Sequence, residues 1–129
     1  MNKIIIVLLI ALVSMSCASV PDSMPPPYAL TDINDWIYNN IEWENVGRTV
    51  ETAQDPSTTL ARRTGDCIDM SKLFIEMSNG AVELFGVVID GKYYHMMVVS
   101  KTFGYYDPTH GRAYGWELPE GWVPYKGKY

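Results

Sequence analysis

The sequence Arg63-Thr64-Gly65-Asp66-Cys67-Ile68-Asp69, near the centre of the chain, indicates the start of a helix. Gly65 and Asp66 favour a turn followed by a helix N-cap, because an aspartate side chain accepts hydrogen bonds from the free N–H groups of a first turn. Apolar residues then recur at helical spacing as far as Met77, and Asn79-Gly80 can close the helix. The sequence therefore predicts a helix that begins at Asp66 or Cys67 and carries the cysteine in its first turn.

The residues after this helix predict a small antiparallel sheet. Residues 81–89 are rich in Val, Leu, Phe and Ile, which is typical of a strand. Asp90-Gly91 is a two-residue hairpin signal, and residues 92–100 predict the returning strand. A third strand is predicted over residues 103–107. The fold class is therefore α+β, with the cysteine-bearing helix packed on an antiparallel sheet.

His95 and Asp107 are predicted to meet across the last two of these strands. If Lys101 centres a tight loop, His95 lies directly opposite Asp107, whereas a wider loop moves Asp107 toward Met97. A slip of two residues keeps both side chains on one face and within diagonal reach, but a slip of one residue separates them. The order Cys67, His95, Asp107 is that of a thiol nucleophile, its base and an orienting carboxylate.

The chemistry of a thiol explains why these residue types are useful together. A free thiol has a pKa of about 8.5 and is mostly protonated at neutral pH, whereas the thiolate attacks a carbonyl. The positive end of the helix and an imidazolium at His95 would both favour the thiolate. His95 would later protonate the leaving amine, and Asp107 would orient the imidazole and stabilise its charge.

The first 17 residues predict an export signal, with Lys3 as its positive end, an apolar run from Ile4 to Val13, and small residues before Cys17. An apolar run this short cannot span a bilayer, which takes about 20 residues. Cys17 favours a lipoprotein whose new N-terminus carries the lipid anchor. An ordinary cut near Ser16, which would give a periplasmic or secreted protein, is the alternative.

Residues 18–30 contain four prolines and predict a tether, since proline denies a helix its hydrogen bonds. Residues 31–129 are enough for one domain. Thr31 is the predicted cap of a first helix that continues to Ile41, and residues 42–63 predict an irregular surface segment. The aromatic residues of 114–129 could line a substrate groove or pack a last irregular strand against the sheet, and packing is the favoured alternative.

The charge of the chain and the spacing of its ligand-type residues argue against nucleic acid and metal ions as partners. The formal net charge is −5, and the basic residues form no cluster beyond Arg62-Arg63, which argues against nucleic acid. A metal site made of Cys67, His95 and Asp107 is disfavoured because no local pair has ligand spacing. No metal and no cofactor are expected.

These residues resemble the transglutaminase-like, papain-related superfamily of cysteine hydrolases. The resemblance covers residues 54–109 and is carried by Pro56-Ser57-Thr58-Thr59-Leu60, by Gly65-Asp66-Cys67, by the strand histidine His95, and by Asp107-Pro108-Thr109. It implies a papain-like core with Cys67 as nucleophile, His95 as general base and acid, and Asp107 as orienting acid. It also implies a side-chain donor for the oxyanion, for which Gln54 is the candidate.

The expected function is cleavage or transfer of an amide bond of a peptide or protein through an acyl-enzyme at Cys67, with hydrolysis preferred. The alternative is a membrane-tethered binding or scaffolding module that keeps the fold and has lost activity. Asp69 is interpreted as a partner of the first helical turn, and His110 as a loop residue.

Overall fold

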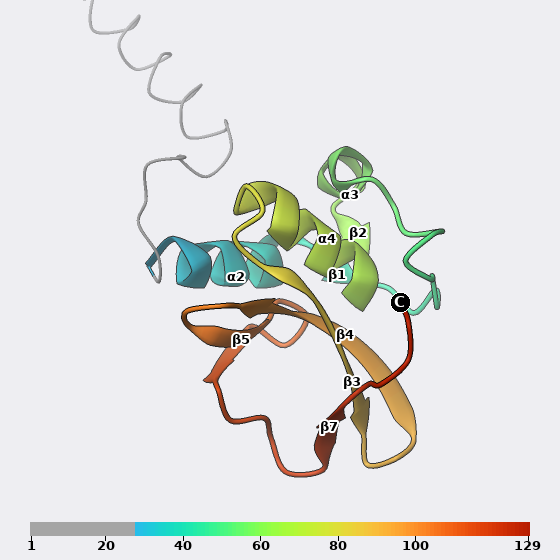
Figure 1. Ribbon diagram of the computed structural model, residues 1–129. Helices are drawn as coiled ribbons and strands as arrows, with labels where there is room; N and C mark the ends of the chain where they lie inside the picture. The colour runs from blue at the N-terminus through green and yellow to red at the C-terminus, as the bar shows by residue number, and fades with distance from the viewer. Residues whose placement is uncertain (1–27) are drawn as a thin grey trace, which may run out of the picture.

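A computed structural model of the chain describes residues 28–129, and it has a helical layer on an antiparallel sheet (Figure 1). The helices are α2 (Tyr28–Asn40), α3 (Pro56–Arg62) and α4 (Cys67–Met77). The strands are β1 (Glu42–Trp43), β2 (Thr64–Gly65), β3 (Glu83–Ile89), β4 (Tyr93–Ser100), β5 (Gly104–Asp107), β6 (Arg112–Gly115) and β7 (Trp122–Pro124). None of the helices in residues 28–129 combines the length and the apolar character that a membrane crossing requires.

The five-stranded sheet has the order β6-β5-β4-β3-β7, and all its neighbouring strands are antiparallel. Helices α2 and α4 pack on it, while α3 packs against α4. The core between the layers contains Leu73 and Phe74 of α4, Val98 of β4 and Tyr106 of β5. This packing sets the first turn of α4 against the sheet, as the sequence predicted.

Helix α2 begins at Tyr28, so the predicted start at Thr31 was wrong by three residues. Leu30 is 2% exposed and joins the core, which gives the chain a reason to become helical before Thr31. The last residues of the predicted tether therefore belong to the domain, while the predicted signal segment, Cys17 and residues 18–27 lie outside the described residues.

The register between β4 and β5 decides how the predicted site forms. Val98 pairs with Tyr106, and Ser100 pairs with Gly104, so residues 101–103 form the loop. The tight loop centred on Lys101 was therefore wrong, and the wider alternative is confirmed. At the other end of β4, Ile89 pairs with Tyr93, which makes the hairpin loop three residues long rather than two.

Two features of the segment predicted as irregular were missed. Helix α3 follows Asp55 and has Pro56 in its first turn, a position that suits proline because its missing N–H is not needed there. Strands β1 and β2 form a parallel pair in which Trp43 lies beside Gly65. The pairing brings Trp43 close to the start of α4.

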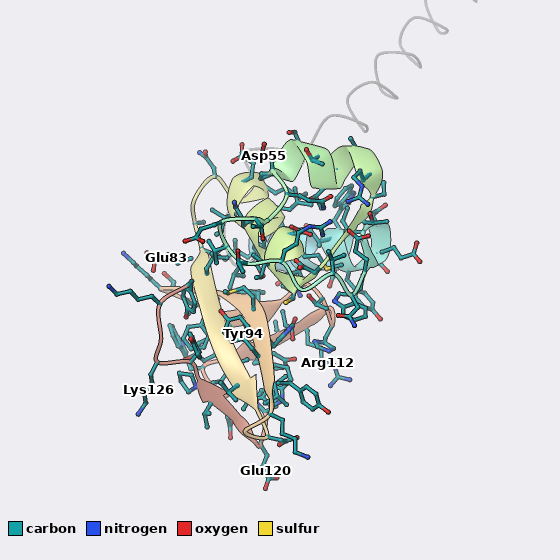
Figure 2. All side chains as sticks on the ribbon, turned by 90° about the vertical axis from the view of Figure 1, so that its right-hand side faces the viewer. Asp55, Glu83, Tyr94, Arg112, Glu120 and Lys126 are labelled. Carbon is teal, nitrogen blue, oxygen red and sulfur yellow. The ribbon has the colours of Figure 1, made fainter. Side chains whose placement is uncertain are left out.

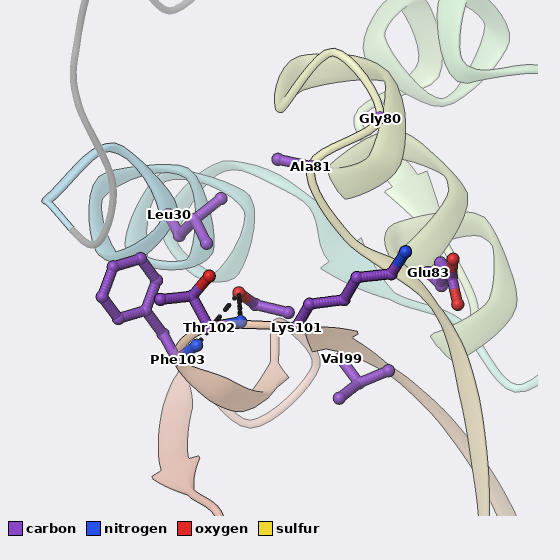
Figure 3. Close-up of a pocket in the computed structure, with 9 residues that line it drawn as sticks. Leu30, Gly80, Ala81, Glu83, Val99, Lys101, Thr102 and Phe103 are labelled. Atoms are coloured by element: carbon purple, nitrogen blue, oxygen red, sulfur yellow. Dashed lines mark hydrogen bonds between the residues drawn. The ribbon is translucent and has the colours of Figure 1, made fainter.

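A cavity of about 250 Å³ lies between the start of α2 and the β4–β5 turn (Figure 3). Its lining includes Leu30, Glu83 and Lys101. The hydroxyl oxygen of Ser100 accepts the N–H groups of Thr102 and Phe103 at 3.2 Å each, which closes the turn at this end of the sheet. The cavity shares no residue with the predicted triad.

Candidate active site

A capping box places Cys67 at the first position of α4. Oδ1 of Asp66 accepts the N–H groups of Ile68 and Asp69 at 3.0 Å each, and Oδ2 of Asp69 accepts the N–H of Asp66 at 3.0 Å. Cys67 is half-buried, and it is a free cysteine. Its sulfur therefore lies at the positive end of the α4 dipole.

Asp69 ties three segments together behind the cysteine. Its carboxylate is buried and accepts the backbone N–H of Gln54 at 2.7 Å and the guanidinium of Arg48 at 2.6 Å. A Cβ at Gly65 would lie 2.7 Å from Cβ of Asp69, so the glycine leaves room for this carboxylate. Asp69 acts within the first turn of α4, in agreement with the sequence interpretation.

Gln54 lies in the same network. Its Nε2 donates to the carbonyl of Thr64 at 2.9 Å, to Oγ1 of Thr59 at 3.2 Å and to Asp69 at 3.3 Å. Its Oε1 accepts from Arg62. The structure thus describes a bracing use for the side-chain amide, and the oxyanion role of Gln54 stays a prediction.

The structure brings His95 together with both of its predicted partners. Nε2–H of His95 donates to Oδ1 of Asp107 at 3.0 Å, and Cys67 lies near enough to the imidazole to raise its pKa. Since Nε2 faces Asp107, Nδ1 is the nitrogen left for the sulfur. Burial lowers the pKa of His95, but the hydrogen bonds and charges of Asp107 and Cys67 raise it by more, to about 9.

Asp107 receives more hydrogen bonds than a triad alone requires. Besides His95, it accepts Nδ1–H of His110 at 2.8 Å, the hydroxyl of Tyr114 at 3.0 Å and the backbone N–H of His110 at 3.4 Å. Burial raises the pKa of this carboxyl, but the bonds from His110 and His95 lower it well below its usual range. Asp107 is therefore a buried anion held from several sides.

Aromatic rings cover this cluster from the edge of the sheet. The ring of Trp122, in β7, meets the rings of His95 and Tyr114 edge-on at 5.5 Å in each case. His95 and His110 also meet edge-on, at 5.1 Å. From the sequence these aromatic residues were expected to pack, and no local pattern connects Tyr114 or Trp122 with Asp107.

A cavity of about 340 Å³ opens directly onto His95. It is lined by Trp43, His95, Thr109 and His110, and about half of the Trp43 side chain is exposed. Trp43 reaches this place because β1 pairs with the strand that leads into α4. The cavity gives a second molecule room beside the imidazole.

Tyr94 precedes His95 in β4, and Figure 2 shows it below the helices on the face turned to the viewer. Burial, followed by the charges of Tyr129 and Cys67, raises the pKa of Tyr94 to about 12. Tyr125 packs edge-on against Tyr94 at 4.9 Å, and the hydroxyl of Tyr129 accepts the N–H of Gly86 at 2.7 Å. Aromatic residues of the last segment therefore pack beside the site.

Among residues 28–129, one group has the composition and spacing to hold a metal ion, namely His95, Asp107 and His110, whose ligand-type atoms lie within 4.8 Å of one another. In the structure these atoms are joined directly by hydrogen bonds of 2.8 and 3.0 Å. Two of these residues, His95 and Asp107, also belong to the predicted triad.

Comparisons with known proteins concern the family and the fold of the chain. A model of the transglutaminase-like superfamily matches residues 18–81, a range that includes Cys67 and ends before His95. A solved structure described as a putative cysteine protease from Cytophaga hutchinsonii is similar in fold, with a TM-score of 0.55 and 21% sequence identity over 79% of this chain. The chain spans 36% of that protein's length. No curated protein matches the sequence.

Proposed function

Because the chain belongs to the transglutaminase-like superfamily, we propose that it is a cysteine hydrolase or acyltransferase that cleaves or transfers an amide bond of a peptide or protein. The observation that carries the proposal is the hydrogen-bonded pair His95 and Asp107 on β4 and β5, with Cys67 at the start of α4 near enough to the imidazole to raise its pKa. A merely structural cysteine needs neither a histidine partner nor a buried carboxylate behind that histidine.

The first chemical step is attack of the Cys67 thiolate on the amide carbon. The C–S bond forms, the C–N bond breaks, and the proton on Nδ1 of His95 passes to the leaving amine. The N–H of Cys67 is one of the first four in α4 and has no acceptor within the helix, so it can donate to the oxyanion. Asp107 keeps the imidazole in the tautomer and orientation that this transfer requires.

The second step resolves the thioester. Water gives hydrolysis, and a primary amine gives transfer; we favour hydrolysis. In both cases the acceptor loses a proton to His95, and the sulfur leaves as the thiolate that pairs with the imidazolium again.

The test uses the purified protein with p-nitrophenyl acetate, followed by a fluorescently labelled protein such as casein. The proposal predicts a burst of p-nitrophenolate equal to the enzyme concentration, an acetyl group on Cys67 by mass spectrometry, and slow cleavage of the labelled protein. Cys67→Ser is the matched control, since it replaces sulfur by oxygen alone. A wild-type protein that shows neither a burst nor turnover above the Cys67→Ser control would be the inactive binding module instead.

We also propose that the protein is exported and held at a membrane by a lipid on Cys17, with residues 18–27 as tether. The support is the sequence pattern of the first 17 residues. In bacterial cells fed a labelled fatty acid, the wild-type protein should carry the label and be found in the membrane fraction. Cys17→Ala should lose both the label and the membrane association. Label that persists in Cys17→Ala would refute the anchor.

A further inference from the structure

Two imidazoles share the carboxylate of Asp107, one on each oxygen. His95 bonds to Oδ1 and His110 to Oδ2, and the two rings meet edge-on at 5.1 Å. His95 is buried, whereas the side chain of His110 is 50% exposed and lines the cavity next to Trp43. The proposed reaction uses only His95, which leaves a fixed and accessible histidine beside it without a role.

The hydrogen bonds determine what His110 offers to the cavity. An ionised carboxylate only accepts hydrogen bonds, so the nitrogen that faces Asp107, Nδ1, carries the hydrogen. When the ring is neutral, Nε2 therefore bears the lone pair and is an acceptor. The bond to Asp107, with the backbone N–H of His110 bonded to the same side chain, holds the ring in place.

We propose that His110 binds the acyl acceptor, the water or primary amine that resolves the thioester, by accepting one of its hydrogens at Nε2. This deepens the proposed function and rests on it. Once the amine has left, His95 is neutral and accepts the other hydrogen of the same molecule. An acceptor with two hydrogens on its nucleophilic atom can bond to both imidazoles while its lone pair faces the thioester.

The atoms balance without any further reactant. The nucleophilic oxygen or nitrogen forms a bond to the thioester carbon, and the C–S bond breaks. One proton moves from the acceptor to His95, and the second hydrogen stays on the product, where His110 held it. Water and primary amines fit this arrangement, whereas a secondary amine lacks one of the two hydrogen bonds. The proposal therefore assigns a class of acceptor as well as a residue.

Two substitutions separate the two nitrogens of His110. His110→Asn places an amide donor near the position of Nδ1, so it can keep the bond to Asp107 while losing the acceptor at Nε2. His110→Gln places its amide near the position of Nε2, so it can restore an acceptor while losing the bond to Asp107. Thermal unfolding curves check that both variants fold.

The burst with p-nitrophenyl acetate measures acylation, and the later steady rate measures deacylation, so the experiment needs no knowledge of the natural substrate. We expect the ratio of steady rate to burst rate to fall about tenfold in His110→Asn, the size of one lost hydrogen bond, and to recover partly in His110→Gln. An unchanged ratio in His110→Asn would overturn the proposal; if both rates fell equally, His110 would only support Asp107. A wild type with neither a burst nor turnover above the Cys67→Ser control would instead refute the proposed function and remove this inference with it.

A second measurement needs no variant and keeps the proposal falsifiable if both variants unfold. Methylamine and dimethylamine compete for the acetyl-enzyme of the wild type, and the ratio of the two amides is compared with their ratio in uncatalysed reaction with the same ester. We expect the enzyme to enrich the methylamine product several-fold over the uncatalysed ratio. Equal ratios would show that the second hydrogen is not recognised.

Discussion

His95 and Asp107 bond across β4 and β5 although they are not directly opposite each other. The register pairs Val98 with Tyr106, which places Asp107 two residues off the position opposite His95, on the same face of the sheet. The diagonal is short enough for Nε2 of His95 to reach Oδ1 at 3.0 Å. The other oxygen is then free for His110 and Tyr114.

Asp107→Asn should lower the burst rate with p-nitrophenyl acetate by about 10² to 10⁴, the range expected when an orienting carboxylate becomes an amide. The amide also donates hydrogen bonds, so it favours the wrong tautomer of His95. Stopped-flow kinetics give the rate, and a melting curve shows that the variant is folded. A folded variant with a wild-type burst would remove Asp107 from the triad.

The alkaline limit of amide cleavage should follow His95. Its pKa of about 9 in the folded protein is above the ordinary 6.5, so the imidazolium that protonates the leaving amine disappears as the pH rises through about 9. Alkylation of Cys67 by iodoacetamide needs only the thiolate and should not fall over the same range. Rates measured from pH 6 to 10 for both reactions test this, and a parallel fall of both would contradict it.

Folding stability should depend on pH, in the direction set by the raised pKa of His95 and the lowered pKa of Asp107. Because the folded-state pKa of His95 is raised, its contribution is complete below about pH 6.5 and is lost as the pH rises through about 9. The folded-state pKa of Asp107 is lowered, so its contribution is present above about pH 4 and is lost in acid. Urea unfolding of the wild type and His95→Ala at pH 6 and pH 9.5 should show a smaller difference at the higher pH.

Tyr114→Phe should reduce the free energy of unfolding by about 1 to 2 kcal/mol, because it removes one hydrogen bond to a buried anion and keeps the ring beside Trp122. Tyr93→Phe is the control, since Tyr93 is 65% exposed and makes no bond to Asp107. Urea unfolding measures both variants. Equal stability of the two would mean that the Tyr114 hydroxyl does not support the carboxylate.

Asp69→Asn should destabilise the fold by about 3 kcal/mol, because it leaves the guanidinium of Arg48 without its buried partner and weakens the capping box. The exposed Asp35→Asn removes the same charge from α2 and should change stability by less than about 0.5 kcal/mol. If the two variants melt alike, the network behind Cys67 is not what holds the start of α4.

Gln54→Ala distinguishes the bracing use of the amide from the oxyanion role. The bonds of Nε2 to Thr64, Thr59 and Asp69 predict a loss of stability with a burst rate that falls by less than tenfold. Loss of an oxyanion donor would lower the rate by about 10² to 10³. A folded variant with the larger loss would establish Gln54 in the oxyanion site.

Local patterns in the sequence were sufficient to predict the elements that carry the triad. Gly65-Asp66 indicated the helix start because a cap depends on one side chain and the N–H groups next to it. Asp90-Gly91 indicated the hairpin because two positive φ values there suit these residues. Because successive side chains of a strand point to opposite faces of the sheet, His95 and Asp107 were expected on the same face in either of the two registers considered, which differ by two residues.

Tertiary structure alone decided the loop length between β4 and β5, and with it the diagonal contact, because the packing of Val98 and Tyr106 under α4 selects one register. It also decided that Tyr114 and Trp122 join Asp107 and His95, since β6 and β7 lie at opposite edges of the sheet and nothing local relates them. His110 looked like a loop residue because its partner is defined by the folded carboxylate. The start of α4 and the position of Cys67 in it could be predicted because they depend on short-range hydrogen bonds, whereas the surroundings of Asp107 depend on side chains that only long-range packing brings together.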